Sequence, residues 1–86
     1  MNLLYRPKFR NQYKKLQPAL AKIVKEKMNL FSINPQDPKL KLHKLTGKWK
    51  GFYSLSITHS YRVILEFTAD MAEARFHSIG THDIYN

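Results

Sequence analysis

The C-terminal half of the chain alternates between hydrophobic and polar side chains with a period of two. Three segments show this pattern: Phe52–Ile57, Tyr61–Phe67 and Glu73–Ile79. A period of two is typical of antiparallel strands that bury one face. We therefore predict three strands, joined by polar turns at residues 58–60 and 69–72.

The alternation also assigns side chains to the two faces of the predicted sheet. Three polar residues of the first two strands fall opposite the hydrophobic positions: Ser54, Ser56 and Arg62. In the last strand, the same parity places Ser78 on the side of Phe76, and His77 with Ile79 on the opposite side.

Helical spacing marks the N-terminal half, after a short predicted strand at Met1–Tyr5. Pro7 suits the first turn of a helix. A hydrophobic stripe follows at spacings of four and three, formed by Phe9, Tyr13 and Leu16. Pro18 ends this helix and can open a second one, which runs roughly to Phe31. We expect the two to form a helical hairpin.

The basic segment Lys39–Lys50 follows a loop at Asn34–Pro38. Its leucines alternate loosely with lysines, so it fits either a short strand or an ordered basic loop. Trp49 stands between Lys48 and Lys50, where it could anchor the loop in the core or stack on a nucleic-acid base.

The predicted order of elements is β-α-α-β-β-β in one domain, residues 1–86. Two helices can cover one face of a four-stranded, mostly antiparallel sheet, which gives an α+β fold. The other face then stays open, with Arg62, Ser54 and Ser56 on it. His59 lies at the adjacent corner, and His82 follows the end of the last strand.

The net charge of the chain is large and unevenly distributed, and it indicates what kind of partner the protein binds. The net charge is +9. Residues 1–50 hold thirteen basic and two acidic side chains, and residues 51–86 hold two basic and four acidic ones. A basic surface of this size favours polyanions such as nucleic acid, the ribosome or an acidic protein.

The composition also bears on the cellular compartment in which the protein works. The chain has no cysteine, so disulfides and cysteine-based metal sites are excluded. We expect no signal peptide, because Met1–Tyr5 is too short for an apolar region and Arg6 and Lys8 follow at once. No apolar run approaches the roughly 20 residues that span a bilayer. We expect a cytoplasmic protein without membrane contact.

The motifs of several enzyme classes are missing from the sequence. The four histidines are His43, His59, His77 and His82. Their spacing fits no zinc motif, so we expect no metal site. The sequence also lacks the G-x-S-x-G of serine hydrolases and a glycine-rich phosphate loop. We expect no cofactor.

Cleavage of RNA needs only the residue types that remain. The 2′-hydroxyl attacks its own phosphate when a base removes its proton, and an acid protonates the departing 5′-oxygen. Histidine suits both tasks because its pKa lies near neutrality. Arginine suits the pentacoordinate phosphorane because its planar fork donates two hydrogen bonds. Arg62, His59 and His82 are the candidates for these roles.

Three motifs in this order resemble the RelE/ParE superfamily of bacterial and archaeal toxins. They are Leu45-x-Gly47-x-Trp49-x-Gly51, Tyr61-Arg62-Val63-Ile64, and Ile79-Gly80-Thr81-His82-Asp83-x-Tyr85. The resemblance covers nearly the whole chain, and the tail is similar to the YafQ-like branch. It implies the same β-α-α-β-β-β fold and a toxin of a type II toxin–antitoxin system.

The resemblance implies an endoribonuclease that cuts mRNA on the ribosome without a metal. In such toxins, a strand arginine acts at the scissile phosphate, a C-terminal histidine or arginine is catalytic, and a C-terminal aromatic residue stacks or transfers protons. Arg62, His82 and Tyr85 match these positions, and His59, which no family position fixes, completes the predicted catalytic residues. The predicted substrate-binding residues are Lys48, Lys50, His43 and Ser56.

The sequence departs from the family pattern in the strand before Arg62. Tyr53 and Leu55 stand where RelE has lysines, and Ser56 and Ser60 stand where the YafQ-like branch has histidine and aspartate. His59 and His43 are candidates to substitute for these groups.

The partners implied by the resemblance are a cognate antitoxin, the ribosome and mRNA, and the toxin–antitoxin complex would bind operator DNA through the antitoxin. Two alternatives stay open: a ParE-like DNA gyrase inhibitor that cuts nothing, and a non-catalytic basic RNA-binding module.

Overall fold

A computed structural model of the chain describes residues 1–85, so Asn86 of the predicted domain lies outside the described residues. Strand β1 (Asn2–Tyr5) precedes helices α1 (Pro7–Lys14) and α2 (Pro18–Ile33). Strands β2 (His43–Lys44), β3 (Tyr53–Ser56), β4 (Arg62–Phe67) and β5 (Glu73–Gly80) follow. Three short 3₁₀ helices complete the described chain: η1 (Pro38–Leu40), η2 (Gly47–Trp49) and η3 (His82–Tyr85).

The strands form one mixed sheet in the order β1-β5-β4-β3-β2. β1 runs parallel to β5, and the other neighbours are antiparallel. The α+β fold and the order of its main elements are therefore as predicted. The difference is a fifth strand, because the undecided segment 39–50 contributes the two-residue β2 as well as η2.

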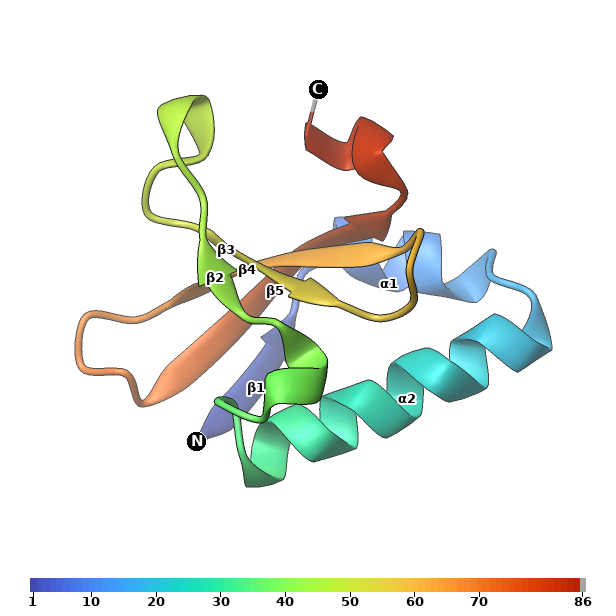
Figure 1. Ribbon diagram of the computed structural model, residues 1–86, viewed down its shortest axis with the longest axis horizontal. Coiled ribbons are helices and arrows are strands. Elements are labelled where there is room, and N and C mark those ends of the chain that lie inside the picture. Colours follow the sequence, from blue (N-terminus) through green and yellow to red (C-terminus); the bar gives the residue numbers. More distant parts are fainter. Residues whose placement is uncertain (86) are drawn as a thin grey trace.

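The helices cover one face of the sheet, which we call the inner face. Prolines occupy the first turn of both helices, as their missing N–H predicts. The core on this face is entirely hydrophobic and joins Phe9, Val24, Met28, Phe31, Leu55, Val63, Leu65 and Phe76. Figure 1 shows α2 on one side of the sheet and the C-terminal η3 on the other.

A β-bulge in β5 corrects the predicted parity of that strand. Leu65 of β4 pairs with Phe76, whereas its neighbour Ile64 pairs with Ser78, so His77 is an extra residue. Beyond the bulge the side chains change faces, and Ile79 joins the core in place of Ser78. The backbone N–H of Ile79 donates to Gln12 Oε1 of α1 at 2.8 Å, which satisfies a donor near the irregular ladder.

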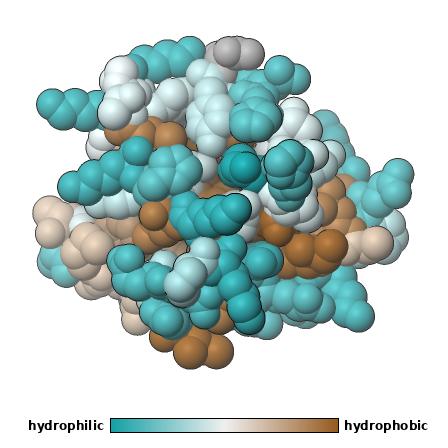
Figure 2. Space-filling view, in the orientation of Figure 1, coloured by the Kyte–Doolittle hydropathy of each residue, from teal (hydrophilic) through white to brown (hydrophobic). Residues whose placement is uncertain are grey.

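The opposite, outer face of the sheet is not open throughout, which corrects a second prediction. Ser54, Ile64 and Ser78 lie side by side across its centre and are all buried. The C-terminal segment and the loop that carries η2 rise on this side of the sheet (Figure 1). Hydrophilic side chains dominate the surface in the same orientation, with separate hydrophobic patches between them (Figure 2).

Candidate functional site

Arg62 begins β4 on the outer face and is held by one nitrogen of its guanidinium. Nη1 donates to Thr58 O at 2.6 Å, to Ser56 Oγ at 3.0 Å and to Tyr61 O at 3.3 Å. Within residues 1–85, no hydrogen bond is recorded from its Nε or Nη2. The half-buried side chain is therefore fixed in place while one edge of its planar fork keeps free donors.

The corner between β3 and β4 carries His59 and owes its shape to Thr58. Thr58 Oγ1 accepts from the backbone N–H of Tyr61 at 3.1 Å, a side-chain turn typical of threonine. Ser56 is partly engaged here too, because its hydroxyl donates to Thr58 O at 3.1 Å and accepts from Arg62. His59 is exposed at the tip of this corner.

The C-terminal tail lies on the same face as Arg62, as predicted. Arg62 pairs with Gly80 in the β4–β5 ladder, so η3 begins two residues beyond that pair. Tyr85 reaches back to the sheet, where its hydroxyl hydrogen-bonds Ser54 Oγ at 2.7 Å. The rings of His82 and Tyr85 are 6.3 Å apart, and His82 is exposed.

Trp49 anchors this tail on the outer face and does not enter the core on the inner face. Its Nε1 donates to the backbone carbonyl of Tyr85 at 2.9 Å. Its ring packs edge-on against Phe52 and His77, with centroids 5.3 and 5.4 Å away. Trp49, Phe52 and His77 thus form an aromatic cluster beside the tail.

The site predicted from the sequence does not include His77 and Ser54, although the parity of their strands places both on the face of Arg62. His77 Nδ1 lies 3.0 Å from Ser78 Oγ. Burial lowers the pKa of the His77 imidazole below its ordinary value, and the charges of Lys8 and Arg6 lower it further. This environment favours the neutral form of the His77 ring, which packs against Trp49.

The remaining predicted residues lie on the β2–β3 side of the sheet. Lys48 and Lys50 are exposed on and after η2, next to Trp49. His43 pairs with Ser54 in the ladder, and its Nδ1 lies 2.9 Å from Lys41 O. Arg62 therefore hydrogen-bonds Ser56, and the rings of His82 and Tyr85 lie near each other. Among the described residues, no side-chain hydrogen bond links either pair to His59.

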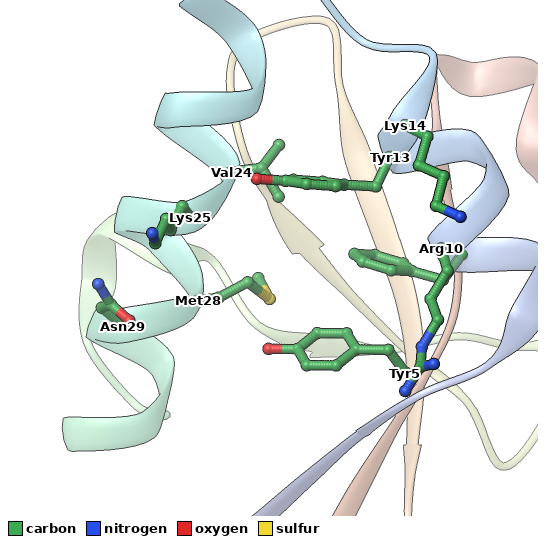
Figure 3. A pocket seen from close by; sticks show the side chains of 9 residues that line it. Tyr5, Arg10, Tyr13, Lys14, Val24, Lys25, Met28 and Asn29 are labelled. Carbon is green, nitrogen blue, oxygen red and sulfur yellow. The ribbon is translucent and has the colours of Figure 1, made fainter. Parts of the chain in front are cut away.

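A cleft of about 590 Å³ lies away from these residues, between β1, α1 and α2. Tyr5 and Tyr13 extend across it toward Val24 and Met28 of α2 (Figure 3). Its rim is basic and is formed by Arg10, Lys14 and Lys25. Burial raises the pKa of the Tyr5 hydroxyl above its ordinary value, and nearby Tyr13 adds to this. The cleft contains none of the residues predicted to be catalytic.

The described residues hold neither a metal cluster nor a membrane-spanning helix. Among the described residues, no three His, Asp or Glu side chains gather closely enough to hold a metal ion. No helix in residues 1–85 is both long and apolar enough to cross a membrane.

Comparison with known proteins rests on the fold. No protein-family model and no curated protein sequence matches the chain. Solved structures do match it over nearly their whole length. YafQ from E. coli strain BL21(DE3) matches with a TM-score of 0.80 at 24% identity, over 98% of this chain and 96% of that chain.

Two other solved structures give the same result. The YoeB/ParE toxin from Agrobacterium tumefaciens matches with a TM-score of 0.79 at 15% identity, over 95% of this chain and 99% of that chain. The E. coli DinJ–YafQ toxin–antitoxin complex matches with a TM-score of 0.76 at 24% identity, over 96% and 93%. The chain therefore has the fold of the YafQ and YoeB toxins, which confirms the predicted resemblance to the RelE/ParE superfamily at the level of the fold.

Proposed function

We propose that this chain is the toxin of a type II toxin–antitoxin system and an endoribonuclease that cuts mRNA on the ribosome, in the cytoplasm. The shared fold with YafQ and YoeB supports the toxin role. The net charge of +9 suits a protein that docks on RNA.

The observation that carries the nuclease proposal is the geometry of Arg62. Nη1 ties the guanidinium to the β3–β4 corner, and the edge formed by Nε and Nη2 keeps its donors. That edge can donate two parallel hydrogen bonds to a phosphate, and it needs little rearrangement to do so. A lysine at this position would offer one point charge and no fork.

The proposed reaction needs no external reactant. A base takes the proton of the ribose 2′-hydroxyl, and the 2′-oxygen forms a bond to phosphorus. The bond from phosphorus to the 5′-oxygen then breaks, and an acid protonates that oxygen. The products are a 2′,3′-cyclic phosphate and a 5′-hydroxyl end, and no metal enters the scheme. Arg62 stabilises the extra negative charge on the phosphorane.

The other predicted residues complete this proposal. His82 and His59 carry out the two proton transfers, and Tyr85 orients the substrate or stacks on one of its nucleobases. Lys48 and Lys50 contact phosphates beside Trp49, while His43 and Ser56 bind substrate at the edge of β3 and beside Arg62. A basic patch next to an aromatic side chain is a common arrangement for single-stranded RNA.

The proposed partner is an antitoxin that docks partly in the cleft between α1 and α2. The solved DinJ–YafQ structure is a toxin–antitoxin complex. In this chain the cleft has an apolar floor and the three basic rim residues Arg10, Lys14 and Lys25. An amphipathic segment with apolar anchors and acidic flanks would match both features.

The partner can be tested with the protein encoded beside this chain. Co-expression should give a stable complex, and the change Lys25→Glu, which reverses one charge on the rim of the cleft, should weaken it. Lys22→Glu is a matched control, because Lys22 is exposed on α2 but does not line the cleft. Equal loss of binding in the control would remove the cleft from the proposal.

Cleavage is tested by expressing the chain alone and mapping the 5′ ends of mRNA. We expect translation to stop and cuts to follow the reading frame. Arg62→Ala and His82→Ala should each lose roughly 10²–10³-fold in rate. Arg75→Ala is the matched control, because Arg75 lies on the neighbouring strand but pairs with Glu73 at 2.8 Å. This control should cut like the wild type.

The same experiment separates the alternatives. DNA damage with intact mRNA would indicate a gyrase inhibitor, and salt-sensitive RNA binding without cuts on ribosomes would indicate a non-catalytic module. Full toxicity of both Arg62→Ala and His82→Ala would contradict the assigned catalytic residues.

A further inference from the structure

Tyr85 is held at two points by residues that are distant in the sequence. Its backbone carbonyl accepts from Trp49 Nε1 at 2.9 Å, and its hydroxyl hydrogen-bonds Ser54 Oγ at 2.7 Å. One bond fixes the backbone and the other fixes the far end of the side chain. Together they determine both the position and the rotation of Tyr85. We call this pair of contacts the Tyr85 clasp.

The two residues that make the clasp are themselves immobilised. Ser54 is fully buried in β3, near the centre of the sheet. Trp49 packs edge-on against Phe52, which directly precedes β3, and against His77 of β5. Rigid supports of this kind are needed where a side chain must keep one orientation.

The base of the tail also packs tightly. A Cβ placed on Gly80 would collide with Cγ2 of Ile84, so η3 crosses directly over the end of β5. A four-residue 3₁₀ helix has little stability of its own and depends on tertiary contacts. The clasp and this packing together therefore hold η3 on the sheet.

We propose that Trp49 and Ser54 are positioning residues of the active site: through the Tyr85 clasp they hold Tyr85 and the neighbouring His82 over the face that carries Arg62. The contacts of the described residues are by themselves sufficient to define the clasp. Its catalytic consequence rests on the proposed nuclease function. Removing either hydrogen bond should therefore lower the catalytic rate more than the affinity for RNA.

The clasp can be measured without any activity assay, because Trp49 is the only tryptophan of the chain. Its fluorescence emission and its quenching by iodide report on whether Tyr85 is in place. Gly80→Ala should push Ile84 away, shift the emission to longer wavelength and increase quenching. The double variant Gly80→Ala/Ile84→Ala removes the collision and should restore the wild-type emission.

The activity test removes the hydrogen bonds of the clasp one at a time. Ser54→Ala and Tyr85→Phe each remove one partner of the same hydrogen bond, and Trp49→Phe removes the indole donor but keeps an aromatic ring at this position. Each should lower kcat roughly fivefold to tenfold with little change in KM. Ser54→Ala/Tyr85→Phe should lose no more than the worse single variant, because both changes remove one interaction. Circular dichroism confirms that each variant is folded.

The outcomes separate the two proposals. Wild-type emission and quenching in Gly80→Ala would show that the clasp does not exist. If variants that retain Trp49 show changed emission but an unchanged kcat, the clasp exists but does not position the active site. Absence of mRNA cleavage by the wild-type chain would overturn the nuclease function and with it the positioning role, while the emission measurement would still decide whether the clasp forms.

Discussion

Arg62 has a structural task as well as its proposed catalytic one, and Arg62→Ala should reveal both. Its Nη1 donates to two backbone carbonyls and one hydroxyl, which ties β4 to the corner between β3 and β4. A hydrogen bond from a charged donor contributes about 1.5–3 kcal/mol, but water can replace part of it at a half-exposed side chain. We expect Arg62→Ala to lower the free energy of unfolding by about 1–3 kcal/mol.

That loss should leave the protein folded. A domain of this length has a free energy of unfolding of about 4–13 kcal/mol, taken at roughly 0.05–0.15 kcal/mol per residue. Urea unfolding followed by far-UV circular dichroism measures the change. With a slope near 1 kcal/mol per molar urea, the midpoint should fall by about 1–3 M. Arg62→Ala should no longer arrest growth at 37 °C, although the purified variant should still unfold cooperatively.

Ser56→Ala is the matched control for the structural part. It removes one acceptor of Arg62 and leaves the guanidinium in place. It should cost about 1 kcal/mol or less. An unchanged midpoint in Arg62→Ala would refute the interpretation that Arg62 holds the corner. A loss above about 5 kcal/mol would mean that lost toxicity reports unfolding, so Arg62→Ala would no longer test catalysis.

Three further predictions concern the core, pH and metals. Phe76→Ala should lower the free energy of unfolding by about 3–5 kcal/mol in urea titrations, because Phe76 is fully buried among aromatic rings; Ile33→Ala, at a position 82% exposed, should change it by less than about 0.5 kcal/mol. The pKa of His77 is lower in the folded protein than its ordinary value of 6.5. As the pH falls below 6.5, the unfolded chain therefore binds a proton at His77 before the folded protein does. The free energy of unfolding should decline over the range between the ordinary pKa and the folded pKa. His77→Gln should remove this part of the decline, and equal pH profiles for both proteins would contradict it. Cleavage on ribosomes kept intact in Mg²⁺ should be unaffected by 1,10-phenanthroline, which chelates transition metals, since the proposed proton transfers and charge stabilisation use histidine and arginine; a loss that added Zn²⁺ or Mn²⁺ restores would contradict this.

The sequence predicts the main elements because each has a local physical cause. Prolines open both helices, and apolar residues at helical spacing cover the inner face. Alternation marks β3, β4 and the first half of β5, where Val63, Leu65 and Phe76 are all buried. These patterns depend only on neighbouring residues, so they can be read without knowledge of tertiary contacts.

The prediction for β5 was wrong beyond Phe76 because a bulge depends on the partner strand. The chain itself contains no feature that separates His77 from a regular strand residue. The extra residue is accommodated by pairing with β4, and the N–H of Ile79 finds its acceptor on Gln12, 67 positions away. An inserted residue reverses every later side chain, so Ser78 and Ile79 exchanged faces.

The sequence by itself therefore determined the order of the elements, the hydrophobic inner face and the placement of Arg62 with the tail on the outer face. Only the tertiary structure decided that Trp49 and Ser54 hold Tyr85, that His77 joins Trp49, and that the centre of the outer face is covered. The reason is the range of the interactions. Periodicity arises between near neighbours, whereas the Tyr85 clasp joins side chains 31 and 36 positions apart that only the folded sheet brings together.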